Sequence, residues 1–279
     1  EALGNSYALV MEDVGGISLQ QYTRTHALSL VEVLGIAIQM ADILEAIFQH
    51  HIIHKDIKPA NIIIEPKSKR IQLIDFSIAS VLSQKTSQKA QSIQTPSGLE
   101  GTLAYLSPEQ TGRMNRGIDY RTDFYSLGIT LYELLTETLP FQATDPMELV
   151  HCHIAQMPPS PHEINPNLPA ALSNIVLKLM AKNAEDRYQS VLGLKHDLTQ
   201  CLHQWKETKT IANFELGEKD ANGHFLIPEK LYGRQAEVKA LLDAFDRVSQ
   251  STSHSVLELG LPSDSPSSEG TAQESNQPE

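Results

Sequence analysis

The longest helical pattern in the chain runs over residues 29–50. Apolar residues recur there at intervals of three and four, which places them on one face of a helix. Ser29 fits an N-cap, and Glu32 stands three residues later in the capping-box position. Similar periodicity predicts a short helix over 18–25 and longer ones over 122–136, 147–157, 170–182 and 191–205.

Shorter apolar runs predict a small amount of β structure. Residues 6–14 are apolar and stop at Gly15 and Gly16, which favours a strand followed by a turn. Residues 62–64 are all isoleucine, residues 71–74 are Ile-Gln-Leu-Ile, and a polar segment separates them. This arrangement predicts a β hairpin.

Other stretches lack periodicity. Residues 77–107 are rich in Ser, Thr and Gln, and a loop of this length is functional or disordered in most compact domains. The Pro-rich stretch 158–161 is predicted to be non-helical. After Trp205 the pattern fades into an extended linker over 206–230. Residues 251–279 are polar without Lys or Arg, and this composition predicts a disordered tail.

Composition narrows the classes of protein. The 279 residues favour one or two domains, and the net charge of -12 argues against nucleic-acid binding. Only two cysteines are present, Cys152 and Cys201, as in proteins of the reducing cytoplasm. No apolar run is long enough to span a membrane. The chain begins Glu-Ala-Leu-Gly, with neither an initiator Met nor a signal segment, which is typical of a fragment.

Most of the chemistry is concentrated in one stretch, His54-Lys-Asp-Ile-Lys-Pro-Ala-Asn61, followed by Asp75. Asp56 can orient a hydroxyl and accept its proton, and Lys58 can reach a transferred phosphoryl group. Asn61 and Asp75 supply the oxygen ligands that Mg²⁺ prefers. A lone His-x-Asp is more often a surface loop, but the complete spacing argues for phosphoryl transfer.

This spacing, with Asp75-Phe76 downstream, resembles the catalytic loop and metal-binding turn of protein kinases. The resemblance implies that ATP and Mg²⁺ are bound and that a protein is the substrate. It assigns catalysis to Asp56, Lys58 and Thr102, and metal binding to Asn61 and Asp75. For the nucleotide site it implies contributions from Met11, Glu12, Val14, Lys58, Asn61, Ile63 and Asp75.

Further along the chain, the same resemblance implies structural roles. Thr102 together with Lys58 matches the serine/threonine type. Asp123 matches a buried acid that holds the backbone of the catalytic loop, and Glu109 with Arg187 matches an internal ion pair. His54 and Phe76 are expected to be packing residues.

Three features depart from the kinase pattern. Lys55 replaces the usual Arg and lacks its bidentate fork. Ser77 replaces the usual Gly, at a cost if the backbone there needs positive φ. A glycine-rich loop, a strand lysine and its glutamate partner have no counterpart in residues 1–5. We therefore expect the hinge and large lobe without the small lobe, and little activity from these 279 residues alone.

A second resemblance covers residues 225–237, where Tyr232-Gly233-Arg234 and then Glu237 resemble the entry to a P-loop ATPase module. The order of modules is similar to the front of large bacterial multidomain signalling kinases. Downstream ATPase or signalling modules are therefore implied as partners. The plainer alternative is a linker followed by one amphipathic helix.

The sequence thus predicts an α+β fold, a mainly helical kinase large lobe with a small β hairpin. The predicted domains are a kinase-like domain over 1–205, a linker over 206–230, the start of an ATPase-like module over 231–250 and a disordered tail over 251–279. The predicted function is a cytoplasmic serine/threonine kinase in signal transduction. The alternative is a catalytically inactive pseudokinase or scaffold that regulates a downstream ATPase.

Overall fold

The computed structural model describes residues 2–3, 6–7, 15–81, 103–114 and 116–220. The chain divides into two compact units, Glu1–Gly223 and His224–Glu279. All described residues belong to the first unit, so the predicted ATPase start over 231–250 and tail over 251–279 lie outside them.

The strands are β1 Ala2–Leu3, β2 Ser6–Tyr7, β3 Ile17–Ser18, β4 Ile52–Ile53, β5 Ile62–Ile64, β6 Ile71–Leu73 and β7 Ser80–Val81. The α-helices are α1 Leu19–Thr23, α2 Leu30–Gln49, α4 Arg121–Thr136, α5 Pro146–Ala155, α6 Pro161–Ile164, α7 Ala170–Leu179 and α8 Val191–Thr208. The described residues also form the short 3₁₀ helices η1 Pro59–Asn61, η2 Pro108–Thr111 and η3 Ala184–Asp186.

Helix α2 begins as its local sequence predicts. The Ser29 backbone N–H donates to Glu32 Oε2 at 2.9 Å, and the Glu32 N–H donates to Ser29 Oγ at 3.3 Å. These two bonds form the capping box, which satisfies backbone donors that the first helical turn leaves unpaired. The predicted start of this helix is confirmed.

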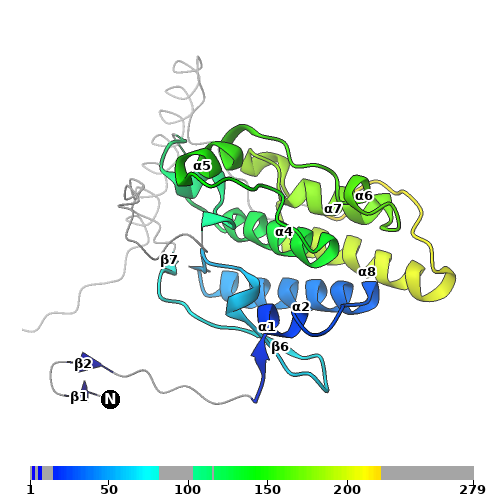
Figure 1. Ribbon diagram of the computed structural model, residues 1–279, viewed down its shortest axis with the longest axis horizontal. Coiled ribbons are helices and arrows are strands. Elements are labelled where there is room, and N and C mark those ends of the chain that lie inside the picture. The colour runs from blue at the N-terminus through cyan, green and yellow to red at the C-terminus, as the bar shows by residue number, and fades with distance from the viewer. Residues whose placement is uncertain (1, 4–5, 8–14, 82–102, 115, 221–279) are drawn as a thin grey trace, which may run out of the picture. The chain divides into compact units, whose positions relative to one another are not determined.

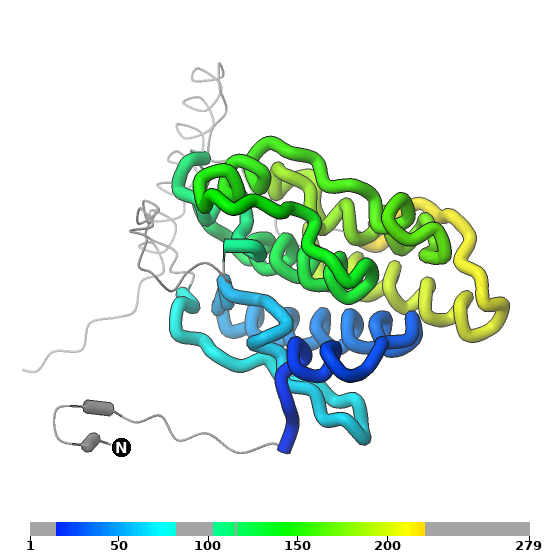
Figure 2. Tube along the Cα trace, viewed as in Figure 1, coloured from blue at the N-terminus to red at the C-terminus, as the bar shows by residue number. Residues whose placement is uncertain are grey.

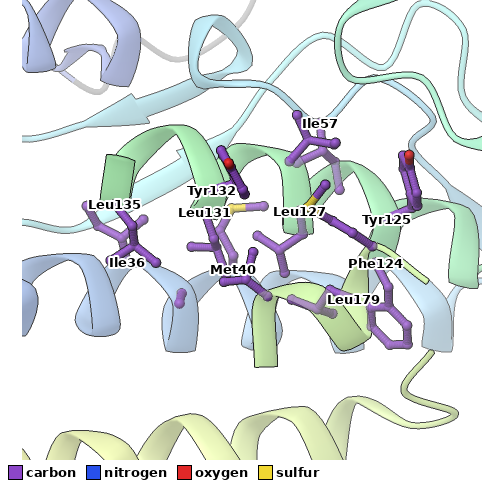
Figure 3. Close-up of a cluster of buried hydrophobic side chains, with 14 of the residues drawn as sticks. Ile36, Met40, Ile57, Phe124, Tyr125, Leu127, Leu131, Tyr132, Leu135 and Leu179 are labelled. Carbon is purple, nitrogen blue, oxygen red and sulfur yellow. The ribbon is translucent and has the colours of Figure 1, made fainter. Parts of the chain in front are cut away.

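The helical core is built around α4, which packs against α2, α6 and α7 (Figure 1). Nearly every face of α4 is buried, so its lack of a polar stripe reflects its central position. Gly128 permits the approach of α7, since a Cβ at this position would lie 2.9 Å from the Cβ of Leu179. Figure 3 shows Leu127 and Leu131 of α4 beside Met40 of α2. Ile57 belongs to the same buried core cluster, so the loop at residues 54–61 rests directly on the core.

The predicted hairpin is present as β5 and β6, which pair antiparallel with Ile62 opposite Leu73. Strand β3 pairs with the other edge of β5, giving the order β3-β5-β6. Ile62 and Ile64 are fully buried, whereas Ile63 is half-buried, as the alternation of side chains along a strand requires. Figure 2 shows this hairpin, in cyan, beside the blue helices α1 and α2, with which it makes contact.

Strand β7 and helix α6 differ from the sequence-based expectation. Strand β7 lies in the long segment after Asp75 and pairs with β4, with Ile53 opposite Ser80. This pairing joins residues that are far apart in the chain, so the local sequence pattern does not predict it. The prediction that 158–161 is wholly non-helical is wrong at Pro161, which starts α6. Proline is tolerated at the first helical position because the N–H that it lacks would have no helical partner there.

The first half of the predicted linker packs back against the domain. Helix α8 continues to Thr208, and Ile211, Phe214 and Leu216 pack against the hydrophobic core. We call residues 211–220 the C-terminal strap. Residues 221–230 of the predicted linker lie outside the described residues.

Asp220 closes the C-terminal strap onto the start of α8. Its carboxylate accepts hydrogen bonds from the backbone N–H of Gln189 at 2.9 Å, and from the backbone N–H of Ser190 at 2.7 Å and its Oγ at 2.8 Å. A negative charge is favourable at this position because the N-terminus of a helix carries partial positive charge. Gly193 accommodates the strap, since a Cβ there would lie 2.6 Å from Asp220 Cβ.

Replacing Asp220 by alanine is expected to lower the free energy of unfolding by about 2 kcal/mol, because several charge-assisted hydrogen bonds at a helix start are lost. Urea denaturation of residues 1–279 measures this change. Glu218→Ala is the matched control, since Glu218 is an exposed acid two residues away. Equal destabilisation by the two variants would contradict the proposed role of Asp220.

Within the described part of the chain, none of the helices combines the length and apolar character that a membrane span requires.

Candidate active site

The catalytic-type loop holds the Asp56 carboxylate by one oxygen. Lys58 Nζ and Asn61 Nδ2 each donate to Asp56 Oδ2 at 2.8 Å. The other oxygen, Oδ1, is buried and has no hydrogen-bond partner among the described residues. A buried carboxylate oxygen without a partner is costly, and a bound hydroxyl would satisfy it.

Asn61 is oriented by the same aspartate. Its Nδ2 donates to the backbone oxygen of Asp56 at 2.9 Å as well as to Oδ2. Because both bonds use the amide nitrogen, the amide oxygen is the atom left for a metal ion. Asn61 is 6% exposed, so its orientation is set by these bonds within the fold.

The β5-β6 hairpin brings Asp75 to the same place. The Ile74 N–H donates to the Asn61 backbone oxygen at 2.9 Å, which extends the strand pairing by one step. Asn61 and Asp75 therefore stand at the same end of the hairpin. The Ser77 side chain lowers the pKa of Asp75 by hydrogen bonding, and the charge of Lys58 adds to this effect. The Asp75 carboxylate is exposed, and both effects favour its ionised form.

The expected backbone cost at Ser77 is not observed. Positive φ occurs instead at Asp75, where φ is 66°, and Ser77 is not among the described residues with positive φ. The Ser77 backbone N–H donates to Asp75 Oδ1 at 3.3 Å. Serine therefore fits the metal-binding turn without the penalty that its replacement of glycine suggested.

His54 and Phe76 pack together beneath the site. Their ring centroids are 4.6 Å apart in an edge-to-face arrangement. His54 Nε2 lies 3.0 Å from the Ile74 backbone oxygen, and burial lowers the pKa of His54. A neutral, buried imidazole fits the expected packing role. Phe76 is 44% exposed in the described structure.

Asp123 of α4 holds the backbone of the catalytic loop. Its Oδ2 accepts from the His54 N–H and its Oδ1 from the Lys55 N–H, both at 2.8 Å. The side chain is fully buried, and burial raises the pKa of Asp123 to about 7, although the two backbone N–H groups act in the opposite direction. The contact predicted for this buried acid is present.

The predicted pair Glu109–Arg187 forms a buried fork. Arg187 Nη1 donates to Glu109 Oε1 at 2.7 Å, and Nη2 donates to Oε2 at 2.8 Å. The Thr122 hydroxyl also donates to Glu109 Oε1, at 2.7 Å. Burial alone would raise the pKa of Glu109, but Arg187 and Thr122 bring it below its usual value.

Some of the nucleotide-binding residues predicted from sequence are described by the structure, and others are not. Ile63 lies on the face of the sheet opposite the buried Ile62 and Ile64, and its side chain covers Gly16, where a Cβ would lie 2.4 Å from Ile63 Cγ2. The other predicted positions, Met11, Glu12, Val14 and the catalytic candidate Thr102, lie outside the described residues.

Gln110 lies near the site but belongs to none of the sequence motifs described above. Its Nε2 donates to the Lys55 backbone oxygen at 2.9 Å. The spacing Ser107-x-x-Gln110 is a capping-box pattern and is visible in the sequence, but the contact with Lys55 exists only in the folded chain.

The donor set fits a magnesium–nucleotide complex. One exposed carboxylate and one oriented amide oxygen match the way Mg²⁺ usually binds, with few protein ligands and with phosphates and water completing its shell. No cluster of three or more His, Cys, Asp or Glu suitable for a metal occurs within the described ranges.

Comparison with known proteins shows which family the chain is similar to. Residues 3–203 match the family model of the protein kinase domain. The chain is 38% identical over 180 residues to hybrid signal transduction histidine kinase G of Dictyostelium discoideum, covering 57% of the chain and 5% of that relative. It is 35% identical over 194 residues to serine/threonine-protein kinase PknB of Mycolicibacterium smegmatis, covering 68% of the chain and 29% of the relative. For the probable serine/threonine-protein kinase PknB of Lactococcus lactis the identity is 32% over 238 residues, 84% of the chain and 36% of the relative.

The fold and site therefore define a protein kinase domain. The chain belongs to the protein kinase domain family, and the predicted fold class and serine/threonine kinase type are confirmed at the level of the family. It spans about a third or less of the length of these relatives, 5% to 36%.

Proposed function

We propose that this domain transfers the γ-phosphoryl group of ATP to serine or threonine hydroxyls of a protein substrate. The observation that carries the proposal is the Asp56 carboxylate, with Oδ2 held by Lys58 and Asn61 and Oδ1 buried without a partner among the described residues. We propose that this oxygen accepts a hydrogen bond from the substrate hydroxyl. The attacking oxygen is then oriented and its proton has an acceptor.

Lys58 and the two oxygen ligands complete the proposed machinery. Lys58 Nζ, already bonded to Asp56, brings a positive charge to the place where phosphoryl charge would develop. Asn61 and Asp75 would hold Mg²⁺, which neutralises phosphate charge when bound. Ile63, with Met11, Glu12 and Val14, is proposed to line the adenine site. Thr102 is proposed to bond Asp56 and Lys58, as the serine/threonine pattern implies.

The inactive-scaffold alternative has less support. It drew on Ser77, and the backbone at Ser77 carries no positive-φ strain. The complete set of Asp56, Lys58, Asn61 and Asp75 also favours the enzyme. Residues 1–279 contain no glycine-rich phosphate loop with a paired strand lysine, so we expect slow transfer from them alone. A longer form that supplied these parts would be expected to restore the rate.

We also propose that the complete protein is a multidomain signalling kinase. Support comes from the ATPase-like residues 225–237 and from the small fraction of each relative that the chain covers. Its partners would then include ATP, a protein substrate and downstream ATPase or signalling modules. Free, buried Cys152 and Cys201 are consistent with a cytoplasmic location.

Incubation of the full-length protein with radiolabelled ATP, Mg²⁺ and a generic protein substrate tests the function. Label is expected on phosphoserine and phosphothreonine after acid hydrolysis. Asp75→Ala is expected to lower the rate by about 100-fold, because one metal ligand is removed. Asp42→Ala, which removes an exposed acid on α2, serves as control and should leave the rate unchanged. Label confined to tyrosine, or a rate indifferent to Asp75, would reject the proposal.

A further inference from the structure

Gln110 is anchored at the end of the segment that leads from the metal-binding turn to α4. It lies in η2 and is 8% exposed. Its Oε1 accepts from the Ser107 N–H at 3.1 Å and from the Ser107 Oγ at 3.0 Å. The preceding residue, Glu109, is fixed by the buried fork with Arg187. The Gln110 side chain is thus held rigidly on one side.

The other end of the Gln110 amide reaches the catalytic loop. Nε2 donates to the backbone oxygen of Lys55 at 2.9 Å. Lys55 has φ of 70°, in the left-handed region that residues with a Cβ adopt at an energetic cost. Its own N–H donates to Asp123 Oδ1 at 2.8 Å. Both backbone polar groups of this strained residue are therefore held by side chains from distant parts of the chain.

The peptide bond between Lys55 and Asp56 is fixed on both edges. Its oxygen accepts from Gln110, and its N–H, that of Asp56, donates to His54 Nδ1 at 3.2 Å. A peptide unit is planar, so fixing both edges fixes the direction in which the next Cα leaves. That Cα carries the carboxylate proposed to orient the substrate hydroxyl.

We propose that Gln110 is a positioning residue for Asp56. Its amide holds the left-handed Lys55 peptide and so links the geometry of the catalytic carboxylate to the end of the segment at Ser107–Gln110. Without the amide, the Lys55 oxygen loses its partner, and the strained peptide can relax by rotation. The role of Asp56 rests on the proposed function, whereas the control of the Lys55 peptide does not.

Gln39 on α2 provides a matched control. Its Nε2 donates to the backbone oxygen of Lys69 at 3.0 Å, and its Oε1 accepts from the Ile71 N–H at 3.2 Å. Lys69 also has positive φ, 59°. Gln39 therefore makes the same kind of bridge to a left-handed lysine, but in the β5-β6 hairpin instead of the catalytic loop.

Hydrogen exchange on residues 1–279 tests the positioning role without any need for activity. Gln110→Met keeps the side-chain length and removes the amide. It is expected to speed exchange of the amides at residues 54–56 by about 10-fold, because the side chain that limits opening of the peptide is lost. Gln39→Met should leave these amides unchanged and speed exchange at Ile71. Equal exchange at residues 54–56 in the two variants would overturn the proposal.

Kinetics of the full-length protein give the second readout. Gln110→Met is expected to lower kcat about 10-fold with KM for ATP within about twofold, since misplacement of a catalytic group affects the chemical step. Gln39→Met should change neither. If exchange responds to Gln110 but the wild-type protein transfers no phosphate, the proposed function fails and the positioning of the peptide stands.

Gln110→Glu keeps the test decisive if the methionine variant does not fold. The ionised carboxylate of this variant has no proton to donate to the Lys55 oxygen, whereas the protonated carboxyl group can donate a hydrogen bond. Its kcat relative to wild type is therefore expected to rise as the pH falls from about 8 to about 6. A pH-independent ratio near one would show that the Gln110 donor has no role in positioning Asp56.

Discussion

Replacing Asp56 by asparagine is expected to lower kcat for phosphoryl transfer by about 10²- to 10⁴-fold. The amide keeps the shape of the side chain but loses the basic oxygen that would face the substrate hydroxyl. It also puts an uncharged group beside Lys58 Nζ, which the wild-type carboxylate holds at 2.8 Å. Steady-state assays with radiolabelled ATP on the full-length protein measure the change.

The control for this prediction is Asp42→Asn, which makes the same chemical change on α2, in an exposed ion pair with Lys195. We expect it to leave kcat unchanged, because surface pairs contribute little and this one is separate from the catalytic loop. Thermal unfolding of both variants shows whether the fold is intact. A folded Asp56→Asn protein with wild-type kcat would mean that the catalytic assignment is wrong.

Replacing Arg187 by methionine is expected to lower the free energy of unfolding by about 3–5 kcal/mol, the usual cost of leaving one buried charge unpaired. Arg187 is 1% exposed, and Glu109 is 4% exposed. The guanidinium also donates to three backbone oxygens, those of Ala181, Arg121 and Lys182. All five of its N–H donors are therefore used.

The control for this prediction is an ion pair at the protein surface. Arg116 and Glu185 form an ion pair with side chains 43% and 59% exposed, so Arg116→Met is expected to cost about 0–1 kcal/mol. Urea denaturation of residues 1–279 measures both variants. The double variant Glu109→Gln, Arg187→Met should cost less than the sum of its single changes, because the unpaired carboxylate is removed. Equal costs for Arg187→Met and Arg116→Met would refute the prediction.

The Glu109–Arg187 pair makes the stability of the fold depend on pH in the acid range. The pKa of Glu109 in the folded chain lies below the 4.5 of an unperturbed glutamate, through Arg187 and Thr122 and against the effect of burial. A group whose pKa is lowered by folding stabilises the fold fully above its unfolded pKa. This contribution is lost as the pH falls from about 4.5 through the folded pKa.

Local sequence is sufficient for helix α2 and for the hairpin. The start of α2 follows from Ser29 and Glu32, which are three residues apart and need no tertiary partner. The β5-β6 hairpin follows from two apolar runs with a short polar connection. Both depend on interactions within a few residues, so the pattern contains the necessary information.

Other elements depend on contacts that the pattern does not contain. Strand β7 forms because Ser80 and Val81 meet β4, which lies nearly thirty residues earlier in the chain. The C-terminal strap follows α8 back because the Asp220 carboxylate finds backbone N–H groups at the start of that helix. Neither contact has a periodic signal, so neither could be predicted from local sequence.

The sequence by itself determined which groups are available to the candidate site: the acid, cation, amide and second acid at Asp56, Lys58, Asn61 and Asp75, in the spacing of a protein kinase. Spacing along the chain limits which groups can meet. Only the tertiary structure decided how they are held. It left Asp56 Oδ1 buried without a partner among the described residues, and it brought Gln110 to the strained peptide that precedes Asp56. Such details arise from packing between distant segments, where small differences in distance decide which hydrogen bonds form.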